Sequence, residues 1–348
     1  CFVIHNGCLR RNKERTTFEV LSLLACVSSD VPSTEDNQMC SASFGRGHGY
    51  RDFAQWTMVC NFIMYFHIWW HFYTRRVATA SADKTCKVWT CPGLQLHAVL
   101  CGHTMALGDC SWAHSDVHLA TASDDCTVQI WDVSRCSCLV LLCGHTGPVL
   151  CCEFNWTDSL IASASCDESI RIWDVRSGCC VSILPAHSDP VTSVQFSRDN
   201  TMLLSASCDG VCRMWDVHNS SCLKSLSFGE PIQLARFIEK SSSIVIATLH
   251  CKFILWDTKT DTCALCLCDI PMGDDSHCSA NRDGVVFVSS QNGSLHMLKL
   301  RGKSPTSLKL LHAHGDSHGL TLAASHRDGA LVTSSFRDNT LDAWLLGA

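Results

Sequence analysis

The sequence predicts an all-β protein of seven repeats, each of which supplies one four-stranded sheet. Five tryptophans carry the repeat at a nearly constant interval: Trp89, Trp131, Trp173, Trp215 and Trp256. Each lies in a run of the apolar and β-branched residues that favour strands. One further interval leads to Leu298, and a slightly longer step reaches Trp344, which makes seven equivalent positions. Because sheets that recur at one period stack around an axis, the predicted architecture is a seven-bladed β-propeller.

The third repeat shows the elements expected in each blade. Its predicted strands are the four runs Val149–Phe154, Leu160–Ser165, Ile170–Asp174 and Cys180–Leu184. Turn-forming residues separate these strands at Asp158-Ser159, Asp167-Glu168 and Ser177-Gly178. One such sheet leaves both faces uncovered, and stacking against neighbouring sheets buries them.

Certain polar residues recur at the same interval as the tryptophans. Three histidines recur at the same interval, in Gly102-His103, Gly144-His145 and Ala186-His187. Three aspartates each stand at one fixed separation after a histidine and at another before a tryptophan: Asp125, Asp167 and Asp209. Four of the tryptophans, from Trp131 to Trp256, are followed directly by aspartate. This pattern resembles the WD-repeat family over about residues 77–348.

The resemblance implies a hydrogen-bonded chain inside each blade. It would link the histidine, the turn aspartate, a strand serine or threonine and the tryptophan indole. The residues expected in these structural chains are His103, Asp125 and Trp131; His145, Asp167 and Trp173; and His187, Asp209 and Trp215. A structural role is favoured over a catalytic one, because breaking a buried polar chain leaves unpaired groups. No catalytic residue is expected.

The pattern weakens toward both ends of the chain. Departures occur in four blades: Asn61 in blade one, Phe228 and His250 in blade five, Asn292 and Leu298 in blade six, and a short insertion between His314 and Asp338 in blade seven. We expect these blades to be less rigid than blades two to four.

The chain is expected to divide into two parts. Residues 1–54 form an N-terminal segment without family resemblance, and residues 55–348 form the propeller, which is clear from about residue 77. The innermost strand of blade one is expected in the aromatic stretch before Arg75. Few residues follow Trp344, so the outermost strand of the last blade should come from upstream. We hypothesise that the ring closes poorly at this point.

Composition excludes several classes of function. A net charge of -6 and a pI near 6.3, without a run of like charges, predict no direct contact with nucleic acid. Residues 53–74 are uncharged and long enough to span a bilayer, but Gln55, Asn61, His67 and His71 interrupt them, so no membrane insertion is expected. The 26 cysteines lack zinc-ribbon spacing. We expect them to be reduced and buried, and we expect no metal and no cofactor.

Residues 151–154, 166–175 and 186–191 resemble a narrower group, the WD-repeat core subunit of histone H3 lysine methyltransferase complexes. This resemblance implies a non-enzymatic, nuclear or also cytoplasmic scaffold whose partners are methyltransferase-complex subunits and the histone H3 tail. It implies an arginine pocket at the mouth of the central channel, lined by Ala82, Gly108, Asp124, Leu150, Cys166, Thr192, Cys208, Gln233 and Cys278. It also implies a second groove on the opposite side, at Lys240, Ser243 and Leu255.

The implied arginine pocket lacks the aromatic rings that the family uses. Leu150 and Ala280 stand at the positions of two phenylalanines, and Cys166 and Cys208 at those of two other aromatic side chains. Asp124 keeps an acidic group that can pair with a guanidinium. Because each lost ring forgoes about 0.5–2 kcal/mol of cation–π energy, we predict weak or absent binding of an arginine-bearing methyltransferase peptide.

Two other functions stay open at this point. The run from Trp173 to Arg176 contains the Trp-Asp-x-Arg pattern of propellers that serve as substrate receptors of cullin ubiquitin ligases. An enzyme is the third alternative, since 18 histidines and 26 cysteines could supply a Cys-His pair. No local motif sets a nucleophile beside a base, so we expect no enzymatic activity.

Overall fold

Strands make up the regular secondary structure of the part of the chain that the structure describes. The computed structural model describes residues 37–45, 53–60, 65–70, 76–90, 95–238, 243–248, 253–267, 278–280, 285–289, 294–299, 306–312, 320–324, 330–335 and 340–345, with side chains in 76–90, 95–238, 243–248 and 253–263. These ranges contain 29 strands and no helix, which confirms the predicted all-β class. No helix able to cross a membrane occurs in this part of the chain.

The described strands form seven antiparallel sheets, which we number one to seven along the chain. Sheets one to three each contain four consecutive strands: β3 (Tyr65–Trp70), β4 (Arg76–Ser81), β5 (Thr85–Thr90) and β6 (Gln95–Cys101); β7 (Leu107–Trp112), β8 (His118–Ser123), β9 (Thr127–Asp132) and β10 (Ser137–Cys143); β11 (Val149–Phe154), β12 (Leu160–Ser165), β13 (Ser169–Asp174) and β14 (Cys180–Pro185).

Sheets four to six repeat this order and sheet seven extends it. Their strands are β15 (Val191–Phe196), β16 (Met202–Ser207), β17 (Val211–Asp216) and β18 (Ser221–Ser227); β19 (Ile232–Ile238), β20 (Ser243–Thr248), β21 (Phe253–Asp257) and β22 (Thr262–Leu267); β23 (Cys278–Ala280), β24 (Val285–Ser289), β25 (Ser294–Lys299) and β26 (Thr306–His312). Sheet seven contains β27 (Leu320–Ala324), β28 (Ala330–Ser335) and β29 (Thr340–Leu345). The prediction of repeated four-stranded sheets is confirmed.

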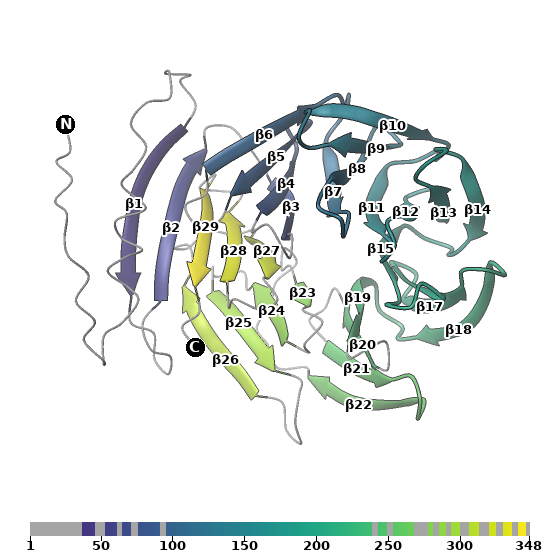
Figure 1. Ribbon diagram of the computed structural model, residues 1–348. Coiled ribbons are helices and arrows are strands. Elements are labelled where there is room, and N and C mark those ends of the chain that lie inside the picture. Colours follow the sequence, from purple (N-terminus) through teal and green to yellow (C-terminus); the bar gives the residue numbers. More distant parts are fainter. Residues whose placement is uncertain are drawn as a thin grey trace, which may run out of the picture.

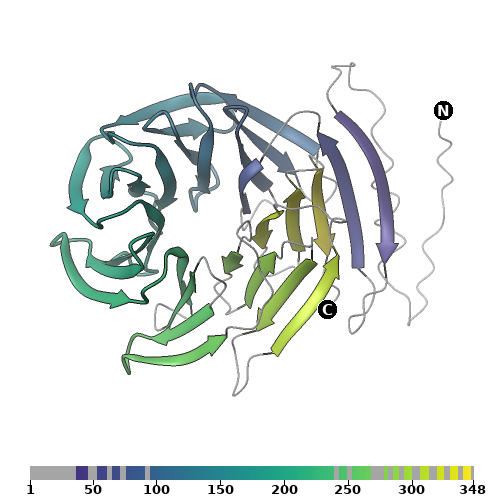
Figure 2. The same cartoon turned by 180° about the vertical axis from the view of Figure 1, so that it is seen from behind.

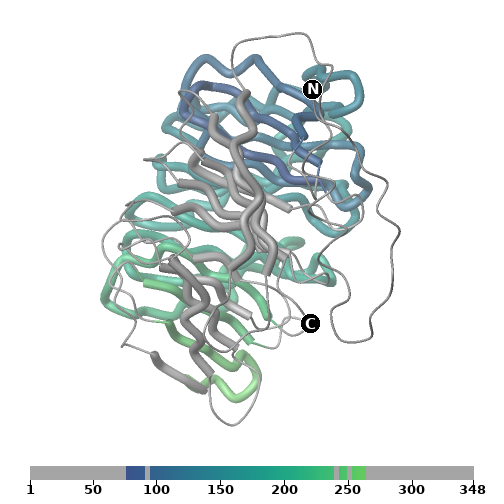
Figure 3. The backbone as a smooth tube through the Cα atoms, turned by 90° about the vertical axis from the view of Figure 1, so that its left-hand side faces the viewer, coloured from purple at the N-terminus to yellow at the C-terminus, as the bar shows by residue number. Residues whose placement is uncertain are grey.

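The sheets are arranged around an axis, with the first strand of sheets one to six and β27 of sheet seven innermost (Figure 1). Contacts between innermost strands run from β23 through β27, β3, β7 and β11 to β15 and β19. In the side view of Figure 3 the coloured strands, from residues 76–263, follow one another from blue to green. Each sheet therefore turns its innermost strand toward the axis.

Sheet three shows how closely the repeat pattern anticipated the strands. β11 and β12 have the predicted bounds, β13 begins one residue earlier than predicted, and β14 ends one residue later. Glu168, in the turn between β12 and β13, has a φ of 66°. This left-handed conformation closes a tight turn and tolerates few side chains well.

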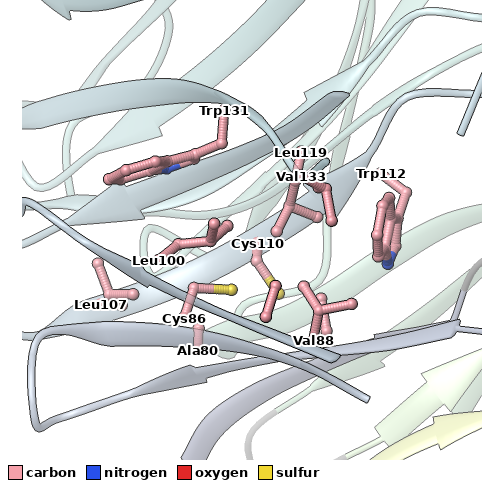
Figure 4. Close-up of a cluster of buried hydrophobic side chains, with 12 residues drawn as sticks. Ala80, Cys86, Val88, Leu100, Leu107, Cys110, Trp112, Leu119, Trp131 and Val133 are labelled. Atoms are coloured by element: carbon pink, nitrogen blue, oxygen red, sulfur yellow. The ribbon is translucent and has the colours of Figure 1, made fainter. Parts of the chain in front are cut away.

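The hydrophobic core lies between neighbouring sheets. One cluster joins Cys86, Val88 and Leu100 of sheet one to Leu107, Cys110 and Trp131 of sheet two, all 2% exposed or less (Figure 4). Similar clusters join sheets two to three, three to four and four to five. Because each sheet buries both faces, burial of apolar area depends on the neighbours as much as on the sheet itself.

Sheet seven takes two strands from the beginning of the chain. β2 (Phe53–Cys60) pairs with β29, and β1 (Asn37–Gly45) pairs with β2, which gives the order β1-β2-β29-β28-β27 (Figure 2). The outermost strand beside β29 thus comes from upstream, as expected. The innermost strand of sheet one is β3, from the aromatic stretch before Arg75, also as expected. The boundary between residues 54 and 55, and the hypothesis of poor closure, stay predictions.

The expectation of buried cysteines is wrong for most of those described. All 16 cysteines whose side chains are described are free, which agrees with a reduced state. Five are buried and nine are exposed. The exposed thiols lie on outer strands and turns, for example Cys138, Cys180 and Cys222. The periphery of a ring of sheets has no further layer to cover it, so strand-like sequence there does not imply burial.

Candidate functional site

A hydrogen-bonded chain of four side chains runs through sheets two, three and four. In sheet three, His145 places Nδ1 2.8 Å from Asp167 Oδ2 and Nε2 2.8 Å from Ser163 Oγ. The Trp173 indole N–H donates to the same hydroxyl at 2.8 Å. The matching bonds in sheets two and four measure 2.7–2.9 Å and join His103, Thr121, Asp125 and Trp131, and His187, Ser205, Asp209 and Trp215.

Burial sets the charge of these groups. Loss of water lowers the pKa of His145, and the bond to Asp167 offsets this only in part. Burial by itself would raise the pKa of Asp167, but hydrogen bonds from Ser169, Thr146 and His145 outweigh it and hold that pKa below its ordinary value. The pKa values of the equivalent pairs in sheets two and four move in the same directions. At neutral pH the imidazoles are therefore neutral and the carboxylates charged.

Asp167, His145 and Ser163 are linked in the order of a hydrolytic triad, but their surroundings do not suit that chemistry. Ser163 is 0% exposed, and its hydroxyl already accepts the Trp173 indole N–H. A nucleophilic serine must reach a substrate carbonyl beside a site for the oxyanion. The chain of bonds therefore contributes to stability, at about 0.5–1.5 kcal/mol for each bond.

Four of the expected pocket residues occupy one special backbone position. In β7, β11, β15 and β19 the pairing register skips the second residue, which is Gly108, Leu150, Thr192 or Gln233. A β-bulge turns the extra residue away from the regular ladder. Two contacts show that the bulge regions of neighbouring sheets lie close together. A Cβ at Gly108 would lie 3.2 Å from the Leu150 carbonyl oxygen, and Thr192 Oγ1 donates to Ile232 O at 2.7 Å.

In sheets two, three and four, a backbone hydrogen bond also joins the turn after the second strand to the residues just before the bulge. The backbone N–H groups of Asp124, Cys166 and Cys208 donate to the carbonyl oxygens of Ala106, Pro148 and Pro190, at 2.9, 2.9 and 3.0 Å. Each acceptor precedes the bulge of the same sheet by two positions. The structure thus gathers six expected pocket residues along one rim, here called the inner rim: Gly108, Asp124, Leu150, Cys166, Thr192 and Cys208.

Asp124 supplies the charge of the inner rim. Burial raises the pKa of the neighbouring Cys166 thiol, and the negative charge of Asp124 raises it further. Burial also raises the pKa of the Cys208 thiol, aided by Asp189 and Asp209. Both thiols are therefore protonated at neutral pH, and a protonated thiol is a poor nucleophile and a poor metal ligand. Among the six residues of the inner rim Asp124 supplies the one carboxylate, and Asp167, Asp189 and Asp209 lie close enough to act on the two thiols.

The remaining expected residues lie as follows. Ala82, half-buried, directly follows β4, at the position in sheet one that Asp124 holds in sheet two. Cys278 begins β23 and Ala280 ends it. In the expected second groove, Ser243 and Leu255 are half-buried on adjacent strands of sheet five, where Ser243 pairs with Asp257 and Leu255 with Val245. Lys240 lies outside the described residues.

Sequence reasoning missed Phe66. In β3 the register also skips the second residue, which is Phe66. This places a phenylalanine at the bulge position of sheet one, beside β7 of sheet two. The signal was present, because Phe66 precedes Gly108 by one repeat interval, the same that separates Trp89 from Trp131.

Sequence reasoning also missed an ion pair that joins sheets three and five across sheet four. Arg236 of β19 reaches Glu153 of β11, and its Nη1 donates to Val194 O of the intervening β15 at 3.2 Å. The two side chains are 12% and 5% exposed. A charged residue within the buried run of β11 was the available signal, since such groups are rarely buried unpaired.

At the end of the molecule opposite the inner rim, a histidine and an arginine each contact one tryptophan ring. His114 stacks on Trp156 with ring centroids 4.3 Å apart, and the Arg198 guanidinium lies 5.4 Å from the Trp156 ring. Asp158 accepts the backbone N–H groups of His114 and Ser115 at 2.7 and 2.8 Å. Burial opposes ionisation of Asp158, but these bonds prevail and lower its pKa to about 2. Arg176 is exposed.

Among the described residues, no group of three or more His, Cys, Asp or Glu is placed to hold a metal ion. Four segments of the chain match the family model for the WD domain, G-beta repeat: residues 61–90, 94–132, 136–174 and 178–216. They contain most of sheets one to four, including all three complete hydrogen-bonded chains. A comparison with curated proteins found no match.

Proposed function

We propose that this chain, which carries four WD40 repeats, is a seven-bladed propeller that binds a cationic side chain of an extended peptide at the inner rim. WD40 repeats imply a protein-interaction scaffold, and such repeats converge loops and strand ends on one surface. The seven sheets around one axis support the seven-bladed architecture.

The position of Asp124 carries the proposal. Its carboxylate acts on the Cys166 thiol of the next sheet, so the charge lies at a junction between blades. Its backbone N–H donates to the Ala106 carbonyl oxygen, which holds the backbone that bears the carboxylate. A guanidinium or ammonium that approaches this rim meets the Asp124 carboxylate, which favours a charge-assisted hydrogen bond.

The affinity for arginine should be modest. Leu150, Cys166 and Cys208 supply no ring for the guanidinium to lie against, and each absent ring forgoes about 0.5–2 kcal/mol. The backbone of Phe66 stands at the bulge position of sheet one, the position that Gly108, Leu150 and Thr192 hold in sheets two to four.

The partner that we propose follows from the narrower resemblance, to WD repeat-containing protein 5 and its paralogue 5B. The chain would be a nuclear subunit of a histone H3 lysine methyltransferase complex that contacts an arginine-bearing subunit or the H3 tail without a cofactor. Asp124 is acidic at a position where the resemblance expects a residue of the arginine pocket, and Leu255 stands at an expected position of the second groove. Both positions support this assignment. The altered rim residues support a weaker contact than that family makes.

A peptide titration tests the rim. Fluorescence anisotropy with a labelled arginine-bearing histone H3 tail peptide should give weak binding that Asp124→Asn reduces further. Asp199→Asn, an exposed aspartate beside Arg198 at the end opposite the inner rim, is the matched control and should leave binding unchanged. Sub-micromolar binding would contradict the weak pocket, and equal loss in the control would contradict the assigned role of Asp124.

A second candidate function is a substrate receptor of a cullin ubiquitin ligase. Arg176 is exposed at the end opposite the inner rim, where an adaptor could contact it without blocking a peptide. Copurification separates the candidates. A methyltransferase partner should be lost in Asp124→Asn and kept in Arg176→Ala, whereas a ligase adaptor should show the reverse.

A further inference from the structure

A buried hydroxyl residue ends the second strand of each of sheets one to five. These residues, here called the rim hydroxyls, are 0–1% exposed: Ser81, Ser123, Ser165, Ser207 and Thr248. In sheets one to four the hydroxyl oxygen accepts the backbone N–H of the turn aspartate two positions later, at 3.0–3.2 Å. The rim hydroxyls are distinct from the hydroxyls that bind the repeated tryptophans, which stand two positions earlier.

The rim hydroxyls of sheets three and four also reach the loop that enters the innermost strand. Ser165 Oγ donates to Gly147 O, and Ser207 Oγ donates to Asp189 O, both at 3.0 Å. Each of these hydroxyls therefore joins the two backbone segments that form the inner rim, which are the turn after the second strand and the loop before the bulge. Its loss would leave buried backbone groups without a partner.

The loop of sheet two differs from the loops of sheets three to five. A proline directly precedes the innermost strand of sheets three, four and five, at Pro148, Pro190 and Pro231, whereas Ala106 precedes the innermost strand of sheet two. Proline fixes its own φ and restricts the residue before it, so it stiffens these three loops independently of their hydrogen bonds. The loop of sheet two lacks this restriction, and its position depends more on hydrogen bonds.

The hydrogen bonds of Ser123 differ in the same place. Its Oγ donates to Ala106 O at 2.8 Å and lies 3.3 Å from Met105 O. The closer acceptor is thus the residue that stands where the other loops have proline. The Ala106 carbonyl oxygen also accepts the backbone N–H of Asp124 at 2.9 Å. One carbonyl group therefore receives both Ser123 and the residue that bears the rim carboxylate.

We propose that Ser123 is a positioning residue of the peptide site, because it holds the loop of sheet two and the backbone of Asp124 in the place where that carboxylate meets a cationic side chain. This inference rests on the proposed function of the inner rim. Ser123 is 0% exposed, so it acts through Asp124 and does not touch the peptide. In sheets three and four proline holds the loop, and the equivalent serines contribute to stability alone.

Peptide binding tests the role of Ser123. With the labelled histone H3 tail peptide, Ser123→Ala should weaken binding about threefold to tenfold, the effect of one lost buried hydrogen bond. Ser207→Ala is the matched control, because it removes an equally buried hydroxyl from a sheet whose loop contains Pro190. It should lower stability to a similar extent and leave binding unchanged. Equal weakening of binding by both variants would overturn the proposal.

A compensating variant separates the position of the loop from the stability of the fold. Ala106→Pro, added to Ser123→Ala, should restore binding to within about twofold of wild type, because proline then holds the loop as it does in the neighbouring sheets. Circular dichroism shows whether each variant is folded at the assay temperature. A folded double variant that binds no better than Ser123→Ala would overturn the proposal.

Alkylation of Cys166 gives a readout that needs no peptide. Burial and then the negative charge of Asp124 raise the pKa of the Cys166 thiol, so displacing that carboxylate should speed the reaction of Cys166 with iodoacetamide at neutral pH. Mass spectrometry of the fragment that contains Cys166 measures the rate. The rate should rise in Ser123→Ala and in Asp124→Asn, and not in Ser207→Ala.

The two readouts keep this inference apart from the proposed function. If Asp124→Asn weakens binding and Ser123→Ala does not, the positioning role is overturned and the proposed function stands. If Asp124→Asn leaves binding unchanged, the proposed function is contradicted, and the alkylation rate of Cys166 still decides the positioning role. A wild-type rate in Ser123→Ala, beside a raised rate in Asp124→Asn, would overturn that role.

Discussion

The repeated tryptophan is buried in sheet three and half-buried in sheet five, and its indole N–H has a different acceptor in each. In sheet three, Trp173 is 2% exposed and donates to Ser163, which also binds His145. In sheet five, Trp256 is half-buried and donates to the exposed Asp261 at 3.2 Å. Its ring lies near Lys224 and Phe228 instead of a histidine.

One hydroxyl explains the difference. At the matching position of the strand before the tryptophan stand Thr79, Thr121, Ser163 and Ser205 in sheets one to four, and Ile246 in sheet five. Sheet one has Trp89 bound to Thr79 at 3.0 Å and 0% exposed, although Asn61 stands at its expected histidine position. The indole is therefore buried wherever the strand offers an acceptor, with or without the histidine, since a buried N–H must be paired.

The largest expected effect comes from removing each tryptophan. Trp173→Ala should destabilise the chain by about 3–5 kcal/mol, because it deletes a fully buried ring and leaves Ser163 without its donor. Trp256→Ala should cost about 1–2 kcal/mol, since its ring already contacts water. Urea unfolding followed by circular dichroism measures both changes. Equal costs would show that the half-buried indole packs as tightly as the buried one.

The shared hydroxyl should come next. Ser163→Ala should cost about 2–3 kcal/mol, because both His145 Nε2 and the Trp173 indole N–H lose a buried partner. Ser227→Ala on β18, where the serine is exposed, is the control and should change stability by less than about 0.5 kcal/mol. A cost below about 0.5 kcal/mol for Ser163→Ala would mean that the hydrogen-bonded chain can rearrange.

Acid should weaken sheets two to four selectively. The pKa values of His103, His145 and His187 are lowered by burial, so the unfolded chain takes up protons first as pH falls below about 6.5, and stability is lost from there down to the folded pKa. The aspartates, whose pKa values are also lowered, add a further loss below about pH 4.

The first part of that loss can be isolated. His187→Asn should lose less stability than wild type between about pH 7.5 and about pH 5.5, because one buried titrating group is gone. His218→Asn, at an exposed site, should keep the wild-type slope. Identical slopes for all three proteins, measured by urea midpoints at each pH, would contradict the assigned burial effect.

The smallest effect should come from the ion pair of sheets four and five. Lys224 and Asp261 are 25% and 59% exposed, so solvent screens their attraction. A double-mutant cycle with Lys224→Met and Asp261→Asn should give a coupling below about 1 kcal/mol. A larger coupling would show that the pair, together with the Trp256 ring, holds sheet five to sheet four.

The sequence predicted which residues form much of the inner rim, but it predicted few of the contacts that these residues make. The family resemblance implied Asp124, Leu150 and Thr192, but it did not show that a β-bulge sets the position of each inner-strand residue or that the Ala106 carbonyl oxygen holds the Asp124 backbone. The repeat period could have found Phe66. Glu153 and Arg236 lie 83 residues apart, and no repeat relation connects them, so only the folded arrangement brings them together.

The sequence by itself determined the strands and their period, because alternation of apolar residues, turn residues and a recurring tryptophan are local properties of the chain. Only the tertiary structure decided which cysteines face solvent, that β1 and β2 extend sheet seven, and that an arginine reaches past one sheet to its partner. Those features depend on which surfaces meet after the sheets stack, and contacts between distant segments leave no periodic trace in the sequence.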